Sequence, residues 1–478
     1  MSTTAILWFR RDLRVHDHPA LHAALAAADV VIPVFVVDEP LLAGRWASAN
    51  RAWFMRESVA ELATTLAGLG APMRILRGRP AEVLPTFARE AGAAHVFVTR
   101  DASPYGRRRD RVVAERLAAG GIGFHAQTGL YVHEPDALAN AEGRALSVYG
   151  EFRRTWDAAP RRAVLPAPDR IPGLHGTGDG VPDLGRPSAD PSLIPAPGER
   201  AARERLALWL GARSSDGVPP VTAYDATRDR LDLDATSRIS QDLRWGLISP
   251  LDVVERVAGP GDGRRVFTAE IAWREFYAHV LWHHPRVLDE PYLAAFAALE
   301  TRDAPVDFVA WAAGRTGYPV VDAAMRQLRA TGFMPNRARM ITASFLAKHL
   351  LLDRRLGEAE FMRHLFDGDV ASNNGGWQWT ASTGTDPQPY FRVFNPILQG
   401  RKFDPDGAYV CRWVPELAGV PVRFVHDPWV MDAATQAAAG CRIGLDYPAP
   451  IVDHADARAR ALAAYGAARN SGEPTTTG

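Results

Sequence analysis

The first 130 residues alternate short apolar runs with longer stretches of helical periodicity, and this alternation narrows the choice of fold. Short, continuous apolar runs are typical of strands that are buried on both faces. Strand–helix alternation predicts an α/β domain with a doubly wound parallel sheet. The expected strands are Ala5–Phe9, Val30–Val37, Met73–Leu76, His95–Thr99 and Gly123–Gln127, and the expected helices are Ser48–Leu69, Pro80–Ala91 and Gly106–Ala119. No GxGxxG follows the first strand, so the dinucleotide fingerprint is missing.

The rest of the chain has a different character. A chain of 478 residues exceeds one ordinary core, so we expect a second domain. Residues 131–200 form a connector whose Pro-, Gly- and Asp-rich part, Pro160–Pro197, is expected to lie over the surface rather than to pack. Residues 201–467 show successive helical segments, which predicts an all-α domain, and residues 468–478 are expected to be a disordered tail.

Composition excludes several classes of protein. The apolar fraction of 47% and charged fraction of 23% are ordinary for a globular protein, and no apolar run is long enough for a membrane span or a secretory signal. The cysteines, Cys411 and Cys441, lack metal-type spacing, which favours a reducing cytoplasm and argues against a zinc site. Basic and acidic residues number 55 each, so only a local basic groove would attract a polyanion.

The segment Asp367–Ser382, DGDVASNNGGWQWTAS, combines acids, amides, glycines and two tryptophans. Asp, Asn and Gly disfavour a plain helix, so the segment predicts a loop and helix start that hold a flat, hydrogen-bonding ring system. A capped turn with core tryptophans is the alternative. On a helix, Trp377 and Trp379 would lie roughly 200° apart and face opposite ways.

A second segment, DATSRIS, follows Tyr224 and Arg228, which lie four residues apart on one expected helix face. The hydroxyls of Thr236, Ser237 and Ser240, together with turn amides, would suit a phosphate cradle. Helix N-capping is the more common use of such residues.

Two further segments place polar and aromatic groups on one helix face. Glu270, Trp273 and Arg274 occupy i, i+3 and i+4, which suits either a half-buried salt bridge beside a core aromatic or a pocket that stacks a base. Asn336 and Met340 share a face in NRARM, where Asn acts either as a hydrogen-bonding group or as an N-cap after proline. Further on, PYFRVFNPILQGRKF sets basic residues among aromatics, as in phosphate-backbone contacts.

Together these segments resemble the DNA photolyase/cryptochrome family, most closely the class I cyclobutane pyrimidine dimer photolyases. The resemblance rests on WFRRDLRVHDHPAL, DATSRIS, EIAWREFY, TGYPVVDAAMRQL, NRARMITASF and DGDVASNNGGWQWTASTGTDPQPYFRVFNP, and runs from Ala5 to about Pro448. It implies that excited FADH⁻ gives one electron to a pyrimidine dimer in ultraviolet-damaged DNA. The dimer then splits, and the electron returns to the flavin. It also implies a monomer in the cytoplasm. A cryptochrome-like photoreceptor without repair and a six-four photoproduct enzyme are the alternatives.

The resemblance also assigns roles by position. The implied FAD-binding residues are Tyr224, Thr236, Ser237, Arg238, Ile239, Ser240, Phe267, Arg274, Asn336, Arg339, Asp367, Asp369 and Asn373, with Asn373 facing flavin N5. The implied catalytic and lesion-pocket residues are Glu270, Trp273, Asn336, Met340, Asn373 and Trp379. The implied DNA contacts are Arg228, Glu270, Trp273, Arg274, Arg337 and Arg392. No metal site is implied.

The chain departs from the family pattern in two places. Most relatives relay electrons to the flavin through three tryptophans, of which only Trp377 is kept, since the other positions hold Arg354 and Thr301. Trp311 is a candidate substitute, although it leaves the gap at Arg354. The acidic pair of folate-binding relatives is also absent, so we expect a second chromophore of deazaflavin or flavin type, with Arg51 and Asp101 as contacts, or else an empty antenna pocket.

Overall fold

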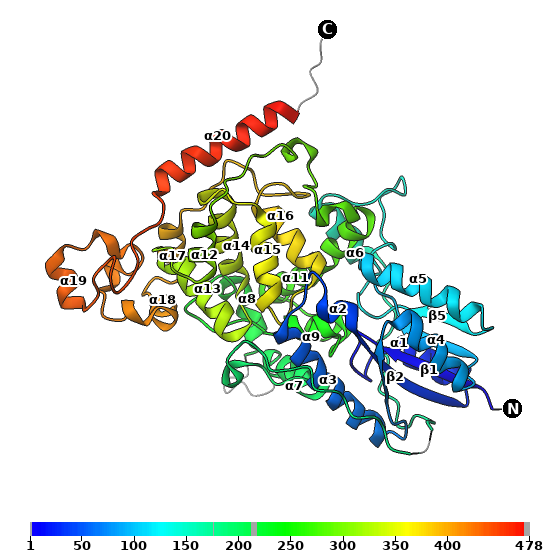
Figure 1. Ribbon diagram of the computed structural model, residues 1–478. Helices are drawn as coiled ribbons and strands as arrows, with labels where there is room; N and C mark the ends of the chain where they lie inside the picture. Colours follow the sequence, from blue (N-terminus) through cyan, green and yellow to red (C-terminus); the bar gives the residue numbers. More distant parts are fainter. Residues whose placement is uncertain (1, 175, 212–217, 473–478) are drawn as a thin grey trace, which may run out of the picture.

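The computed structural model describes residues 2–174, 176–211 and 218–472. Its first domain is a parallel five-stranded sheet in the order β3-β2-β1-β4-β5 (Figure 1). The predicted fold class is therefore confirmed, and each expected strand lies within two residues of an observed one. The strands are β1 (Thr4–Phe9), β2 (Val30–Asp38), β3 (Arg74–Gly78), β4 (His95–Thr99) and β5 (Gly123–Gln127).

Helices cover both faces of this sheet. Alternate residues of β1 point to opposite faces, so they join two different buried clusters. Ile6 and Trp8 join one buried cluster with α4 and α5, while Leu7 and Phe9 join another with α1 and α3. The helices of this domain are α1 (Pro19–Ala27), α2 (Glu39–Ala43), α3 (Ala49–Gly68), α4 (Pro80–Glu90) and α5 (Pro104–Ala118). The sequence PALHAALAA of α1 is apolar all round, so periodicity did not reveal it.

The connector packs more than expected. It contains α6 (Tyr149–Ala158), whose Phe152 and Trp156 are fully buried in the main core. The Pro-rich part is mostly exposed or half-buried, but Ile171 is buried and its N–H donates to the Leu69 carbonyl at 2.8 Å. The expectation that this part does not pack is therefore wrong at Ile171, because a single apolar side chain can anchor an otherwise polar segment.

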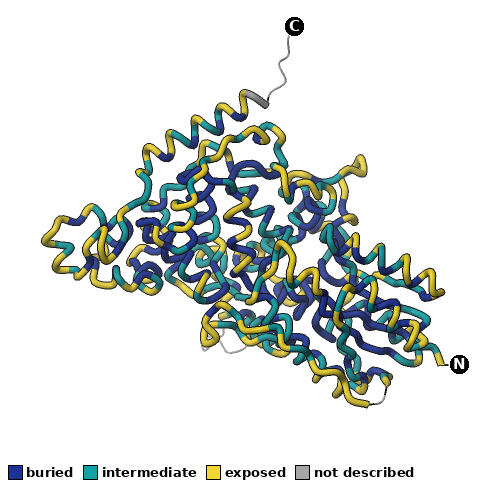
Figure 2. The backbone as a smooth tube through the Cα atoms, viewed as in Figure 1, coloured by how far each residue is buried: buried dark blue, intermediate teal, exposed yellow. Residues whose placement is uncertain are grey.

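The second domain is helical, and buried residues concentrate at its centre (Figure 2). The last helix extends to Gly472, beyond the expected boundary at Ala467, and residues 473–478 of the expected tail lie outside the described residues. The helices are α7 (Glu199–Trp209), α8 (Tyr224–Thr227), α9 (Ser240–Trp245), α10 (Pro250–Val257), α11 (Asp262–His283), α12 (Pro305–Ala312), α13 (Pro319–Thr331), α14 (Asn336–Ser344), a π-helix (Phe345–His349), α15 (Arg354–His364), α16 (Val370–Thr380), α17 (Pro396–Phe403), α18 (Ala408–Trp413), α19 (Ala433–Ala439) and α20 (His454–Gly472).

The two domains meet tightly where the chain after β1 crosses the end of α9. Arg14 is fully buried and donates to the carbonyls of Gly129 at 2.8 Å and Gly246 at 3.0 Å. Gly246 ends α9 with φ of +62°, and a Cβ at this position would come within 2.0 Å of the Arg11 carbonyl oxygen. Glycine is thus required here by both conformation and space.

We expect Gly246→Ala to destabilise the protein far more than Gly440→Ala. Both glycines end helices in the left-handed conformation, but a Cβ on Gly440 meets nothing within 4 Å. The Gly440 variant should therefore show only the conformational cost of about 1–2 kcal/mol. Thermal unfolding of the two variants measures the difference, and equal losses would contradict the steric argument.

Candidate functional site

A cavity of about 440 Å³ lies among α8, α9, α11, α14 and α16. All of the predicted FAD, lesion-pocket and DNA residues line it except Arg337 and Arg392. Those that line it are Tyr224, Arg228, Thr236, Ser237, Arg238, Ile239, Ser240, Phe267, Glu270, Trp273, Arg274, Asn336, Arg339, Met340, Asp367, Asp369, Asn373, Trp377 and Trp379. Segments separated by up to 155 positions in the chain therefore converge on one space.

The DATSRIS segment forms an irregular turn that leads into α9. Arg238 has φ of +50° and its guanidinium pairs with Asp234 at 2.8 Å. The N-cap of α9 is Ile239, which makes no side-chain cap, so the hydroxyls do not serve α9 in the way that the capping interpretation required. Ser240 Oγ is instead buried without a hydrogen-bond partner among the described residues, which is consistent with a bound polar group.

The stripe on α11 faces the same cavity. Glu270 forms an ion pair with Arg228, and Arg274 donates to the carbonyls of Leu130 at 2.9 Å and Leu243 at 3.4 Å. Burial raises the pKa of Glu270, against the opposing effect of the Arg228 charge. The stripe thus contributes a salt bridge to the cavity wall, and stacking of a base on Trp273 stays a prediction.

At the start of α14, Asn336 is the first helical residue and Pro335 occupies the N-cap, so Asn336 does not act as the N-cap. The Asn336 amide lies 3.8 Å from the Met340 sulfur, which places both groups on one face. Arg339 pairs with Asp367 at 2.7 Å, while the other Asp367 oxygen, Oδ1, is buried without a partner among the described residues.

The Asp367–Ser382 segment begins with a short loop and the start of α16, as expected, but the helix continues through the amides and glycines to Thr380. Asp369 is the N-cap of α16 and accepts from the N–H groups of Ala371 and Ser372, both at 3.1 Å. A Cβ on Gly375 would lie 2.1 Å from the Tyr277 ring. The glycine therefore permits the close approach of α11 and α16, and tertiary packing outweighs its low helix propensity.

The cavity wall carries an unusual set of unsatisfied polar atoms. Ser240 Oγ, Arg244 Nη1, Asp367 Oδ1 and Trp377 Nε1 are all buried and have no hydrogen-bond partner among the described residues. Buried polar groups are rarely left in this state, because each costs about 1–3 kcal/mol. A ligand with phosphate, hydroxyl and heterocyclic groups would satisfy them, so these residues fit FAD.

Sequence reasoning missed several lining residues, among them Arg244, Tyr277 and Phe333. Arg244 lies four positions after Ser240, and Tyr277 lies four after Trp273. Extending the same helix faces by one turn would have found both. Phe333 packs against the Arg238 guanidinium at 4.6 Å and has no comparable sequence signal.

Two of the predicted DNA contacts lie outside the cavity. Arg337 pairs with Asp229 at 2.6 Å, and Arg392 is exposed on the loop after α16. The Arg392 carbonyl accepts a hydrogen bond from the buried Lys348 ammonium at 2.8 Å, which ties this loop to the π-helix. Contact of Arg337 and Arg392 with phosphates remains a prediction.

We expect Asp369→Asn to destabilise the protein by about 3 kcal/mol, because Arg11 would lose its nearer carboxylate partner, at 2.7 Å, and keep only Asp101 at 3.7 Å. Burial alone would raise the pKa of Asp369, but Arg11, Arg244, Arg274 and the α16 N–H groups lower it to about 2. The charged carboxylate of Asp369 therefore stabilises the fold fully at pH values above its ordinary pKa of 3.8. This stabilisation is lost as the pH falls towards the pKa of about 2 in the folded protein.

Urea unfolding at pH 7 and at pH 3 measures both effects of Asp369→Asn, and the loss should be smaller at pH 3. Asp432→Asn is the matched control, since Asp432 caps α19 through the Thr435 N–H on the surface. A loss of equal size in the two variants would contradict a special role for the buried pair.

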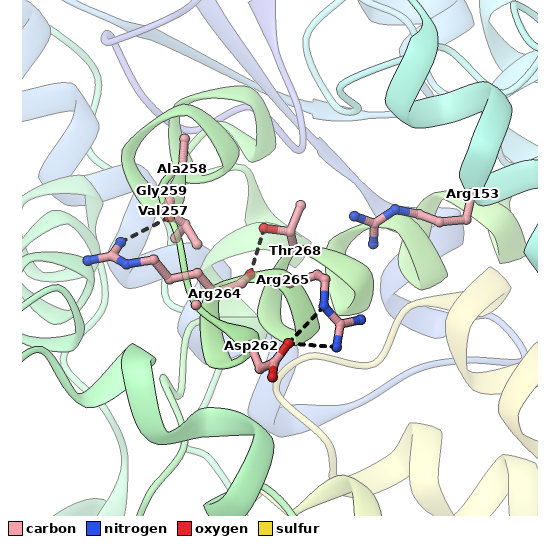
Figure 3. Close-up of a pocket in the computed structure, with 9 residues that line it drawn as sticks. Arg153, Val257, Ala258, Gly259, Asp262, Arg264, Arg265 and Thr268 are labelled. Atoms are coloured by element: carbon pink, nitrogen blue, oxygen red, sulfur yellow. Dashed lines mark hydrogen bonds and ion pairs between the residues drawn. The ribbon is translucent and has the colours of Figure 1, made fainter.

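A second, more open cavity of about 490 Å³ lies beside the start of α11 (Figure 3). Its arginines are already engaged, since Arg265 pairs with Asp262 at 3.0 Å and Arg264 donates to the Val257 carbonyl at 2.9 Å. It contains no predicted site residue, so the candidate site is the cavity between α8 and α16.

The candidate antenna contacts are engaged within the protein. Arg51 donates to the carbonyls of Met362, Leu365 and Trp46, which joins the α/β domain to the helical domain. Asp101 is buried between Arg11 at 3.7 Å and Arg109 at 3.5 Å. Contact of Arg51 and Asp101 with a second chromophore stays a prediction.

The aromatic neighbours of Trp377 differ from the expected relay. Arg354 is buried and pairs with Glu358 at 3.0 Å. Trp311 lies directly against Trp377, with ring centroids 6.1 Å apart and planes at 72°. Arg354 therefore does not interrupt the path between these two indoles, contrary to the expected gap.

Within the described residues, no cluster of three or more His, Cys, Asp or Glu side chains could hold a metal ion. The helices of the same residues include none that is both long and apolar enough to cross a membrane.

An α/β domain joined to a helical domain, whose cavity of about 440 Å³ combines aromatic walls with charged and hydroxyl groups, defines a class of two-domain cofactor proteins. Residues 5–170 match the family model described as DNA photolyase, and residues 267–467 match that of the FAD binding domain of DNA photolyase. The chain therefore belongs to the DNA photolyase family, and FAD is its cofactor.

Individual relatives cover almost the whole chain. A deoxyribodipyrimidine photo-lyase from Agrobacterium fabrum is 38% identical, with 98% of each chain covered. The crystal structure of a bacterial class III photolyase from Agrobacterium tumefaciens superposes with a TM-score of 0.91, at 37% identity and 98% coverage of both chains. An archaeal photolyase from Sulfolobus tokodaii, described with two FAD molecules, has a TM-score of 0.83 at 28% identity, covering 97% of this chain and all of that one.

Proposed function

We propose that this protein is a deoxyribodipyrimidine photo-lyase, which uses light to split cyclobutane pyrimidine dimers in DNA. One observation carries the proposal: the DATSRIS turn and the Asp367–Asn373 segment share a single cavity with Glu270, Trp273, Asn336, Met340 and Trp379. A cofactor held by the first group would lie beside a pyrimidine dimer held by the second. Proximity of donor and substrate is the main requirement of such a reaction.

When bound, FAD supplies a light-absorbing one-electron donor, and the protein supplies binding and orientation. Ser240 and the turn before it would hold the phosphates, while Arg339 and Asp367 would hold the ribose and ring side. The Asn373 amide donates to the Glu358 carbonyl at 3.0 Å, which fixes its side chain in the cavity wall. An amide can bond a neutral or a reduced flavin without imposing a fixed charge.

Glu270 would donate a hydrogen bond to a carbonyl of the dimer. Burial already favours its protonated form. A DNA phosphate would compete for Arg228, and loss of that ion pair would raise the pKa of Glu270 further. Binding of the damaged strand would thus favour protonation of Glu270, and the protonated carboxyl would stabilise negative charge on the dimer.

Selectivity for damage would come partly from the DNA. A dimer stacks and pairs poorly, so flipping it out costs less than flipping normal bases. Trp273 and Trp379 would form the walls against which the extruded bases pack, and the packed bases would keep water from the reacting groups. We also propose that the protein acts as a monomer in the cytoplasm, and that the α/β domain carries a second chromophore of flavin or deazaflavin type.

A direct assay tests the function. The purified protein is mixed with a dimer-containing oligonucleotide, and absorbance in the pyrimidine band is followed under blue light and in darkness. Recovery in light alone supports dimer repair. A flavin-loaded protein that leaves the dimer unchanged in light would contradict it, as a signalling photoreceptor would behave in this way.

A further inference from the structure

The lesion-side wall of the cavity has a support that comes from the connector. The ring of Tyr149, the first residue of α6, stacks on Trp273 with centroids 3.6 Å apart and planes at 8°. The Tyr149 hydroxyl donates to the carbonyl of Ala269, one turn before Trp273 on α11, at 2.8 Å. Both the ring face and the hydroxyl of Tyr149 thus contact the helix that carries Trp273.

The other aromatic neighbours of Trp273 do not define its plane in this way. Phe276 meets Trp273 edge-on at 5.6 Å and 78°, and Tyr277 is tilted at 5.5 Å and 36°. Only Tyr149 lies parallel to the indole among the ring contacts of the described residues. Because a stacked pair restricts both tilt and distance, Tyr149 sets the orientation of the wall.

The same stretch of chain also holds the segment that follows Trp379. The Tyr149 N–H donates to Asp386 at 3.1 Å, and the Thr385 hydroxyl donates to the Ser147 carbonyl. Asp386 has φ of +47°, a conformation that is unfavourable for a residue with a Cβ and is maintained by such contacts. The start of α6 therefore contacts both the helix that carries Trp273 and the segment that follows Trp379.

We propose that Tyr149 is a positioning residue for lesion recognition: it holds Trp273 in the plane that accepts an extruded pyrimidine dimer. The inference rests on the proposed function, since it assigns Trp273 to the dimer pocket. The ring contacts and hydrogen bonds of Tyr149 reach Trp273, Phe276, Ala269 and Asp386, none of which is an implied FAD-binding residue, so we expect Tyr149 variants to keep the cofactor.

The test compares Tyr149→Leu, which removes the stack, with Tyr149→Phe, which keeps the ring and removes the hydroxyl. Tyr149→Leu should weaken binding of a dimer-containing duplex about tenfold, as expected for the loss of one aromatic pair. Binding of the undamaged duplex by Tyr149→Leu should be unchanged. Tyr149→Phe should retain most of the preference for the dimer-containing duplex. Equilibrium titration of both duplexes gives the ratio, and flavin absorbance reports the cofactor.

Phe152→Leu is the matched control, because Phe152 packs α6 against Phe276 without touching the Trp273 ring plane. It should lower stability without changing the ratio of the two affinities. Unchanged discrimination in Tyr149→Leu, or an equal loss on damaged and undamaged DNA, would overturn the positioning role. A wild-type protein without preference for dimers would instead contradict the proposed function itself.

Discussion

Replacing Glu270 and Trp273 together with alanine is expected to abolish light-dependent repair while the protein keeps its flavin. Both side chains project from α11 into the cavity, whereas the residues that fit FAD come mainly from the DATSRIS turn, α14 and α16. Stacking of a base on an aromatic side chain is worth about 1–3 kcal/mol, so Trp273→Ala alone should weaken dimer binding about 5- to 150-fold.

The variant Glu270→Gln distinguishes two roles of Glu270, hydrogen-bond donation to the dimer and the supply of a titratable proton. Glutamine donates as a protonated carboxyl would, but it cannot neutralise Arg228. This variant should bind damaged DNA nearly as well as the wild type and repair it with a lower yield per photon. Affinity and yield are measured on the same duplex, the first by titration in darkness and the second under calibrated light.

Trp282→Ala provides the control for the tryptophan. Trp282 lies on the same helix, its ring contacts the guanidinium of Arg107 at 3.8 Å, and it does not line the cavity. Its loss should leave dimer affinity unchanged. Repair that survives in the double variant, or flavin that is lost from it, would contradict the assignment of this wall.

Periodicity was sufficient for the sheet, because buried strands leave an unmistakable apolar pattern. It failed at α16, where local propensity opposes a helix. Gly375 is tolerated because the Tyr277 ring occupies the space of a Cβ, and Asp369 satisfies the first N–H groups of the helix. Such tertiary contacts join distant segments, so no window of the sequence contains them.

The candidate site could be predicted wherever its residues share one helix face, as Glu270, Trp273 and Arg274 do. The residues alone did not show that these helix faces line one common site. Only the resemblance to a family predicted that. Tyr149 could not be predicted, because it lies in the connector, far along the chain from the Trp273 that it stacks on. The chemistry of a single tyrosine before a short helix gives no sign of that contact.

The electron path to the flavin also depends on contacts that the sequence did not reveal. Trp311 is fully buried, and its indole N–H donates to the Thr342 carbonyl at 3.0 Å, an arrangement that stabilises positive charge on the ring. Arg354, at the position expected for the middle tryptophan, has no aromatic ring to oxidise, and its guanidinium is paired with Glu358 at 3.0 Å. We therefore expect Trp311, which contacts Trp377 directly, to be the second member of the relay.

Trp377→Phe is expected to abolish photoreduction of oxidised FAD, and Trp311→Phe to slow it at least about tenfold, since phenylalanine raises the barrier by more than 1.4 kcal/mol. Blue-light bleaching of the flavin band, with an external thiol as the final reductant, gives the rate. Trp413→Phe is the control, because Trp413 lies on α18 and outside the cavity. Wild-type bleaching that persists in Trp311→Phe would exclude this path, whereas repair by chemically reduced enzyme should be retained in every one of these variants whose flavin remains bound.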